Sequence, residues 1–138
     1  MTESTTATPR EVLERFHQAT IDGTLRDAID WYDEEGVHEL PFAPAPVPKR
    51  MEGRETIRGF MTAAAGKGTV QNEKLSDVQV WDTTDPEVVI SEYTVHGRFE
   101  ATGEPFEMRN VLILRVRNGK ILLTRSYFDP VKLAPLAK

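Results

Sequence analysis

The sequence contains no cysteine among its 138 residues. This absence excludes disulfide scaffolds, iron–sulfur clusters, thiol nucleophiles and zinc sites built on cysteine. It also favours a cytoplasmic location, because a small secreted domain has more reason to carry disulfides. No apolar run approaches the roughly 20 residues that span a bilayer, and the polar start of the chain lacks the apolar core of a signal peptide. We therefore expect a soluble, cytoplasmic protein with no membrane partner.

Positive charge is also scarce, since 17 Lys and Arg residues against 22 Asp and Glu residues give a formal net charge of -5. Attraction to phosphates dominates nucleic-acid binding, so we expect no nucleic-acid partner. The apolar content of 39% and charged content of 28% are ordinary for a globular chain. A chain of this length can bury one core. We expect a flexible tail over 1–7 and a single domain over 8–138.

Helical signals are confined to the first half of the chain. Thr8 begins the first helix, because Pro9 suits the first helical position and Glu11 completes a capping box. Gly23 ends this helix. A second cap signal at Thr24, with an acidic residue three positions later, predicts a short helix up to Trp31.

The middle of the chain alternates short elements with turns. Residues 33–36 are expected to break the second helix, and a short strand follows over 37–40. The segment 41–48 holds four of the nine prolines, which excludes helix and leaves two interpretations, a surface connection or a lid over a pocket. A third helix is predicted over 53–65, ending at Gly66, with its apolar face formed by Ile57, Phe60, Met61 and Ala64.

The second half of the chain is typical of β-structure. Strands are predicted over 75–81, 88–99, 106–117 and 121–128, and Asn118-Gly119 is a strong hairpin signal between the last two. Helices followed by a β-meander indicate an α+β fold, with three N-terminal helices packed on one face of a curved antiparallel sheet.

The strand segment 111–114 is apolar on both faces, whereas a half-solvated strand should alternate. Val111 and Ile113 project away from the helices, so something else must cover them. A second subunit would do so, which predicts a homodimer with Arg109 and Arg115 pairing across the interface with Glu92 or Glu107. The alternative cover is the C-terminal tail, through Leu133 and Leu136.

Five segments are distinctive beyond the order of elements. They are Val-Trp-Asp-Thr-Thr-Asp-Pro at 80–86, Glu92, His-Gly-Arg at 96–98, Asn-Gly-Lys-Ile at 118–121 and Arg-Ser-Tyr-Phe-Asp-Pro at 125–130. Together with the order of elements, they resemble the nuclear-transport-factor-2-like superfamily, a cone-shaped, cystatin-like fold. Within it the chain is similar to SnoaL-like polyketide cyclases, ketosteroid isomerase, limonene epoxide hydrolase and, most of all, the phenazine-biosynthesis A/B proteins.

The resemblance implies that most catalytic residues of these relatives are replaced here. The charged triad of limonene-type epoxide hydrolases aligns with Tyr93, Val95 and Ser126, so that hydrolysis is disfavoured. The acidic residue of the phenazine proteins aligns with Ser126 as well, and their histidine with Phe60. The acid–base aspartate of SnoaL-type cyclases corresponds to Asp129.

The resemblance to ketosteroid isomerase implies that one hydrogen-bonding position of that enzyme's active site still carries a donor. The tyrosine donor and the base of that enzyme align with Phe16 and Leu40, which cannot replace them. The neutral acid aligns with Asn110, whose amide can still donate a hydrogen bond to an oxyanion.

Alignment and strand alternation together predict an apolar cavity inside the cone with a few hydroxyl and amide groups, as is usual for a small-molecule site. The alternative is a filled core with no cavity. The side chains expected to face inward are Phe16, Trp31, Leu40, Phe60, Tyr93, Val95, Met108, Asn110, Leu112, Leu114, Thr124, Ser126 and Phe128.

Glu39 is the first candidate for acid–base chemistry, because a carboxylate among apolar side chains would have a raised pKa. If Glu39 points to solvent instead, the role passes to Asp129. His38 projects opposite to Glu39, so at most one of the two faces the cavity. His96 is interpreted as structural and His17 as solvent-facing.

No metal site or other cofactor is expected, because the three histidines lack ligand spacing. The arginines of the long strands are interpreted as charges of the outer face that pair with acidic neighbours on the same strands. They are Arg98, Arg109, Arg115 and Arg117, with Glu100 and Glu107 as the expected partners.

Two functions from different classes remain. The first is a cofactor-independent enzyme that isomerises, cyclises or dehydrates a hydrophobic polyketide-, terpenoid- or phenazine-like intermediate by proton transfer. In it, Asn110, Ser126 and Tyr93 would hydrogen-bond the developing enolate oxygen. The second is a protein that binds a hydrophobic small molecule without catalysis.

Overall fold

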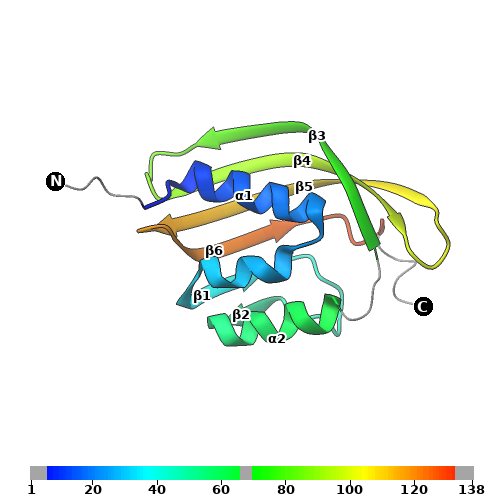
Figure 1. The fold of residues 1–138 in the computed structure, drawn as a ribbon, viewed down its shortest axis with the longest axis horizontal. Coiled ribbons are helices and arrows are strands. Elements are labelled where there is room, and N and C mark those ends of the chain that lie inside the picture. Colours follow the sequence, from blue (N-terminus) through cyan, green and yellow to red (C-terminus); the bar gives the residue numbers. More distant parts are fainter. Residues whose placement is uncertain (1–5, 66–69, 133–138) are drawn as a thin grey trace.

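The computed structural model describes residues 6–65 and 70–132. It contains one six-stranded sheet in the order β2-β1-β6-β5-β4-β3, and its helices lie on one face of that sheet (Figure 1). The elements in chain order are α1 (Pro9–Asp22), the 3-10 helix η1 (Leu25–Trp31), β1 (Tyr32–Glu39), β2 (Arg50–Glu52), α2 (Arg54–Ala65), β3 (Val70–Asp82), β4 (Val88–Phe99), β5 (Pro105–Arg117) and β6 (Lys120–Tyr127).

Helix α1 confirms the capping box predicted from the sequence. Thr8 Oγ1 accepts a hydrogen bond from Glu11 N, and the Glu11 carboxylate accepts one from Thr8 N. Gly23 ends the helix in the left-handed conformation, at φ 74°. Of the expected flexible tail, residues 1–5 lie outside the described residues, whereas Ala7 packs against the core.

The expectation of three N-terminal helices is not confirmed as stated. The second segment, η1, is a 3-10 helix, and the Thr24 side chain makes no capping hydrogen bond to it. The third, α2, follows the two strands β1 and β2 rather than the other helices. Gly66, its predicted end, lies outside the described residues, as does the side chain of Ala64.

Strand β1 differs most from the sequence prediction. It begins at Tyr32, so the expected break over 33–36 is instead an irregular part of the strand, with a register shift before Val37. Its neighbour β6 runs parallel to it, so the expected purely antiparallel sheet is wrong. Strand β2 pairs antiparallel with β1. It has three residues, too few for an alternation of apolar and polar side chains to be recognised in the sequence.

The meander matches its prediction closely at β4, β5 and β6, which begin and end within one residue of the expected bounds. Strand β3 is longer than expected and begins at Val70. Its first residues reach the end of α1, where Asn72 Nδ2 donates a hydrogen bond to the carbonyl oxygen of Thr20 over 3.2 Å. This contact joins the wide end of the sheet to the helices.

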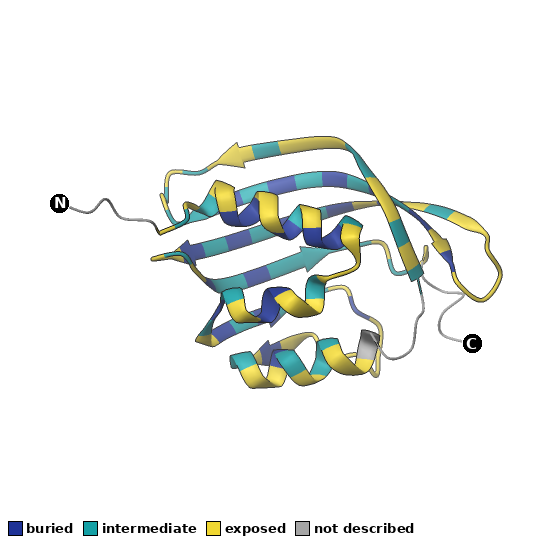
Figure 2. Ribbon diagram, viewed as in Figure 1, coloured by how far each residue is buried: buried dark blue, intermediate teal, exposed yellow. Residues whose placement is uncertain are grey.

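The core fills the narrow end of the cone, between α1 and the sheet. Buried residues form stripes along α1, β4 and β5 (Figure 2). Alternate side chains of the strands point toward the helices, and those of α1 meet them at helical spacing. The central buried side chains are Val12, Leu13, Ile29, Ile57, Val89, Leu114, Val116 and Ile121.

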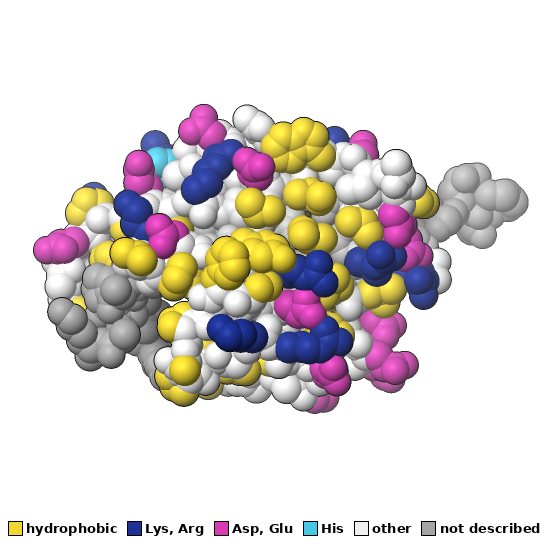
Figure 3. Space-filling view, turned by 180° about the vertical axis from the view of Figure 1, so that it is seen from behind, with side chains coloured by type: hydrophobic (Ala, Val, Ile, Leu, Met, Phe, Trp, Pro, Cys, Tyr) yellow, Lys and Arg dark blue, Asp and Glu magenta, His cyan; other side chains and the backbone are white. Residues whose placement is uncertain are grey.

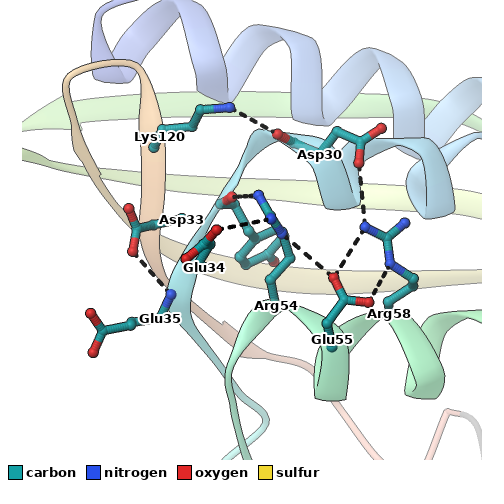
Figure 4. A network of polar contacts seen from close by, with 9 residues as sticks. Asp30, Asp33, Glu34, Glu35, Arg54, Glu55, Arg58 and Lys120 are labelled. Atoms are coloured by element: carbon teal, nitrogen blue, oxygen red, sulfur yellow. Dashed lines mark hydrogen bonds and ion pairs between the residues drawn. The ribbon is translucent and has the colours of Figure 1, made fainter.

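A network of charged side chains joins α2 to η1 and β1 (Figure 4). Arg54 donates to the carbonyl oxygen of Tyr32 over 3.3 Å, and Arg58 lies 3.5 Å from Asp30 and 2.9 Å from Glu55. Exposed ion pairs of this kind contribute about 0–1 kcal/mol each. Their role is therefore orientation, since α2 carries Phe60 on the face turned toward the sheet.

Gly97 in β4 allows a close approach that any side chain would prevent. A Cβ atom there would lie 2.4 Å from the carbonyl oxygen of Gln71 and 2.9 Å from the Phe106 ring. We expect Gly97→Ala to lower the free energy of unfolding by about 1–3 kcal/mol, because backbone must move. Urea denaturation measures this change.

Gly59 supplies the matched control, because it is exposed in α2 and a Cβ there would meet nothing within 4 Å. Gly59→Ala should raise the free energy of unfolding by roughly 0.5–1 kcal/mol through helix propensity. Equal effects of the two substitutions would contradict the close approach at Gly97.

Candidate functional site

An open cavity of about 880 Å³ lies in the wide end of the cone, between the helices and the sheet. This volume is within the range of roughly 300–1,000 Å³ typical of small-molecule sites, so the alternative of a filled core is wrong. Most of the wall is apolar and comes from Phe16, Leu40, Phe60, Met61, Val95, Phe106, Met108 and Leu112.

The polar side chains of the wall include His38, Tyr93, Asn110 and Ser126, each from a different strand, and the rim adds Thr20, Asp22, Arg26, Gln71, Asn72 and Glu100. The strand registers bring the first four together. Tyr93 and Asn110 are directly opposite in the antiparallel pair β4–β5, and Ser126 faces Leu112 in the pair β5–β6. The cavity is therefore an apolar chamber with hydrogen-bonding groups on its floor.

His38 is the buried titratable group of β1 in the cavity wall, with 8% of its surface exposed. Its Nδ1 lies 2.7 Å from Thr124 Oγ1 on β6. Its Nε2 makes no hydrogen bond with a described residue. The fully buried side-chain atoms without a partner in the described residues are Arg54 Nε and Asn110 Oδ1, so Nε2 retains an accessible surface. Nε2 is therefore open to the cavity.

Burial also sets the charge of His38. Desolvation lowers the pKa of this imidazole to about 4, and the negative charge of Glu39 raises it only in part. At neutral pH the ring is therefore uncharged, which suits its contact with the Phe60 ring 6.4 Å away.

Glu39 does not occupy the position expected for an acid–base group. Its side chain points to the outer face of the sheet, where Arg125 Nε lies 2.5 Å from Oε1 and Arg50 binds the other oxygen. The hydrogen bond from Arg125 lowers the pKa of Glu39, so the expected raised pKa is wrong. The alternation of the strand explains this, because His38 takes the inward place.

Other candidates also lie outside the cavity wall. Asp129 is exposed, and its carboxylate accepts a hydrogen bond from the backbone N–H of Val131. Trp31 packs against the core from η1, and Phe128 is half-buried beyond the end of β6. Leu114 and Thr124 point inward as expected but are fully buried behind the wall.

The proline-rich segment is a surface connection, and none of its residues over 41–48 lines the cavity. Phe42 is 57% exposed and contacts the Tyr127 ring at 5.2 Å on the outer face of the sheet. The interpretation of this segment as a lid is therefore wrong.

The sequence analysis placed His17 in solvent, which is wrong. Its side chain lies on the face of α1 that is turned toward the sheet. Its Nε2 is 3.0 Å from Ser91 Oγ, and its ring meets Tyr93 edge to face at 4.8 Å. Burial lowers the pKa of His17. The sequence missed this position because Ser91, its partner, is distant in the chain.

Tyr93 and Asn110 form a buried pair at the floor of the cavity. Burial raises the pKa of Tyr93, and a hydrogen bond from Asn110 opposes that rise. Asn110 is nine-tenths buried, and its Oδ1 has no partner among the described residues. The unpartnered Oδ1 can only accept a hydrogen bond, so a hydrogen bond from Asn110 to a ligand oxygen would come from Nδ2.

His96 is outside the cavity, in agreement with its interpretation as a structural residue. Its Nε2 lies 2.6 Å from Ser76 Oγ, and Nδ1 lies 3.4 Å from Glu107.

The rim of the cavity contains residues that the sequence analysis did not propose. Leu25 and Arg26 of η1 and the first residues of β3, over 70–72, contribute to it. The bend of β3 toward α1 brings these segments together, and no periodicity in the sequence indicates such a bend.

The outer-face arginines have partners other than the expected Glu100 and Glu107. Arg98 pairs with Glu73 and Arg109 with Glu92. Arg115 and Arg117 both pair with Glu87. These pairs are within one chain, so the expected cross-interface role of Arg109 and Arg115 has no support here.

Over residues 6–65 and 70–132, no cluster of three or more histidine, aspartate or glutamate side chains is arranged to hold a metal ion. In the same part of the chain, no helix is both long and apolar enough to cross a membrane.

The geometry defines a conical α+β protein with an internal, largely apolar cavity. The chain belongs to the SnoaL-like domain family, whose model matches residues 13–124. It is 33% identical over 123 residues to an uncharacterized PhzA/B-like protein, PA3332 of Pseudomonas aeruginosa, covering 89% of this chain and 85% of the relative. The resemblance to phenazine A/B-like proteins is thus confirmed.

Two solved structures support the cone-shaped fold. A Bacillus subtilis protein described as a candidate isomerase superposes with a TM-score of 0.83 at 24% identity, covering 92% of this chain and 90% of its own. A Catenulispora acidiphila protein with a ketosteroid isomerase-like fold gives a TM-score of 0.70 at 18% identity, covering 91% and 90%. At these identities the similarity concerns the fold alone.

The pKa of His38 generates a prediction about stability. The unfolded chain binds a proton at this residue below about pH 6.5, whereas the folded protein does so only near pH 4. The free energy of unfolding should therefore fall by up to about 3 kcal/mol as the pH decreases through this window. Thermal unfolding at several pH values measures the slope.

His38→Gln should have a shallower slope in this window, because glutamine does not titrate. His17 and all carboxylates are retained in both proteins, so their contributions cancel in the comparison. Identical slopes would show that His38 is not held neutral by burial.

Proposed function

We propose that the cavity binds a hydrophobic ketone-like intermediate, of polyketide, terpenoid or phenazine type, and promotes its isomerisation, cyclisation or dehydration by proton transfer without a cofactor. His38 acts on the ligand through Nε2, and Asn110, Ser126 and Tyr93 hydrogen-bond its oxygen atoms. The observation that carries this proposal is a neutral, buried imidazole with a free nitrogen in an apolar chamber.

The physical basis is the low polarity of the chamber. A hydrogen bond to a developing enolate is stronger beside apolar side chains than in bulk water, and the apolar wall orients the ring system of the ligand. Membership of the SnoaL-like family supports this class of chemistry.

A second candidate is a protein that binds such a ligand without turning it over. The observation that favours it is the position of Glu39, which is engaged by two arginines on the outer face. With Asp129 exposed as well, neither expected carboxylate faces the bound ligand as a base.

Deuterium exchange distinguishes the two candidates. In D₂O, the protein should accelerate exchange of the C1 protons of 2-tetralone, a bicyclic ketone that fits an apolar chamber, as followed by NMR. His38→Phe should lower that acceleration on the order of 10²-fold, the usual loss for one group that stabilises an oxyanion or transfers a proton.

The matched control is His96→Phe, which makes the same change at a histidine outside the cavity. It should exchange 2-tetralone as the unsubstituted protein does. Binding of 2-tetralone without any accelerated exchange would favour the non-catalytic candidate.

We also propose that the outer face of the sheet forms a homodimer interface. Trp81, which is 44% exposed, lies beside Ile90 and Ile113 in one row of paired strands. Val111 and Tyr127 are paired in a neighbouring row. Apolar side chains gather at the centre of this face with charges around them (Figure 3), as is typical of an interface.

Val111→Glu tests the interface, because a two-fold contact places the new charge twice in the buried centre. The unsubstituted protein should elute as a dimer in size-exclusion chromatography with light scattering, and the variant as a monomer. Thr62→Glu, which adds the same charge on exposed α2, should remain dimeric. A monomeric unsubstituted protein at micromolar concentration would contradict the interface and leave the C-terminal tail, outside the described residues, as the cover.

A further inference from the structure

Two buried hydroxyl groups form a chain behind His38. The phenol oxygen of Tyr32 lies 2.7 Å from Thr124 Oγ1, and Thr124 Oγ1 lies 2.7 Å from His38 Nδ1. Tyr32 and Thr124 are both 0% exposed, so bulk water does not compete for these groups. The donors and acceptors of the chain therefore decide where each proton lies.

One arrangement of the protons satisfies every buried donor. Tyr32 has no other acceptor among the described residues, so its hydroxyl donates to Thr124 Oγ1. The hydroxyl of Thr124 then donates to His38 Nδ1, which can accept only if it carries no proton. The single proton of the neutral imidazole must therefore be on Nε2.

The opposite arrangement leaves a buried donor without an acceptor. If Nδ1–H donated to Thr124 and Thr124 donated to Tyr32, the phenolic proton would have no acceptor among the described residues. If Nδ1–H and the phenol both donated to Thr124 Oγ1, the hydroxyl proton of Thr124 would have none. Ionisation of the phenol does not remove this problem, because burial raises the pKa of Tyr32 far above neutrality. Buried polar groups are rarely left in such a state, because the lost hydrogen bonds to water are not replaced.

We propose that Tyr32 and Thr124 hold His38 as the neutral tautomer protonated at Nε2, so that the cavity presents an N–H donor to a carbonyl oxygen of its ligand. The two hydroxyl residues are positioning residues, since they act through His38. The consequence for the ligand rests on the proposed function, whereas the tautomer does not.

This tautomer assigns His38 the role of donor rather than base. When the C–H bond beside the ligand carbonyl breaks, its proton passes to water at the open mouth of the cavity. The C–H electron pair forms the new C=C bond, and the carbonyl π pair moves onto oxygen. The Nε2–H group stabilises that negative oxygen while remaining neutral, because a ring of such low basicity keeps a polarised N–H without taking up a second proton.

Among the described residues, Glu39 is the charged group that shifts the pKa of the His38 ring. Glu39 adjoins His38 on β1 and raises its pKa, but its carboxylate is neutralised by Arg50 and Arg125 on the outer face. The groups that pack against the ring from α2 and β6 are the uncharged Phe60 and Thr124. The surroundings therefore favour the neutral ring.

Nitrogen-15 NMR of histidine-labelled protein at pH 7 tests the tautomer without any ligand. The signals of His38 are assigned by their loss in His38→Gln. We expect the downfield shift of an unprotonated ring nitrogen at Nδ1 and the upfield shift of a protonated one at Nε2. The reverse pattern in the unsubstituted protein overturns the proposal.

Substitutions at Thr124 test whether the chain sets this pattern. Thr124→Val removes the donor to Nδ1 and should allow the Nδ1–H tautomer to become populated, whereas Thr124→Ser keeps the hydroxyl and should retain the original pattern. If Thr124→Val does not fold, the spectra of the unsubstituted protein and of Thr124→Ser still test the proposal, because it requires His38 to be protonated at Nε2 in both. A folded Thr124→Val with an unchanged tautomer overturns the role of the chain.

Two ligands that differ by one carbonyl group test whether His38 donates a hydrogen bond to a ligand carbonyl. Tetralin has the ring system of 2-tetralone without its oxygen, so the ratio of their dissociation constants isolates the hydrogen bond. His38→Phe should lower the preference for 2-tetralone on the order of fivefold, the value of one neutral hydrogen bond, and His96→Phe should not. An unchanged ratio in His38→Phe, or binding of tetralin alone, overturns the carbonyl assignment.

The two proposals fail in different ways. A protonated Nε2 and a preference for 2-tetralone, without deuterium exchange, would refute catalysis and leave this inference standing. Exchange by a protein with a protonated Nδ1 would refute this inference and leave the proposed function standing, with His38 as a base.

Discussion

The parallel pairing of β1 with β6 is the constraint on which the site depends. It places His38 opposite Thr124, and the hydrogen bond between them holds the imidazole against the cavity wall. The same pairing extends the meander by two strands and gives α2 a surface on which to pack. Without it, the wide end of the cone would have no wall opposite α1.

The cone separates two environments along one sheet. At the narrow end, side chains from α1, β4 and β5 fill the interior, as in any close-packed core. At the wide end, the same inward alternation that builds the core lines a chamber between the helices and the sheet instead. The inner face of each strand thus supplies stability at one end and hydrogen-bonding groups at the other.

Alternation also explains why the two neighbours on β1 have different chemistry. His38 faces an apolar interior, where a charge is costly, and burial lowers its pKa. Glu39 faces the outer surface, where Arg125 and Arg50 lower its pKa by stabilising the carboxylate. One strand therefore carries a neutral group inward and a charged group outward, and exchanging them would place an unpaired charge in the core.

The sequence by itself determined the helix signals, the meander and most of the inward set, because these depend on local capping and on the period of two along strands. It also placed His38 and Glu39 on opposite sides. Only the tertiary structure decided which of the two faces the cavity, because that choice depends on the pairing of β1 with β6, whose residues are more than 80 positions apart. For the same reason the hydroxyl chain from Tyr32 to His38 and the position of His17 beneath α1 have no signal in the sequence: each joins side chains that only the folded sheet brings together.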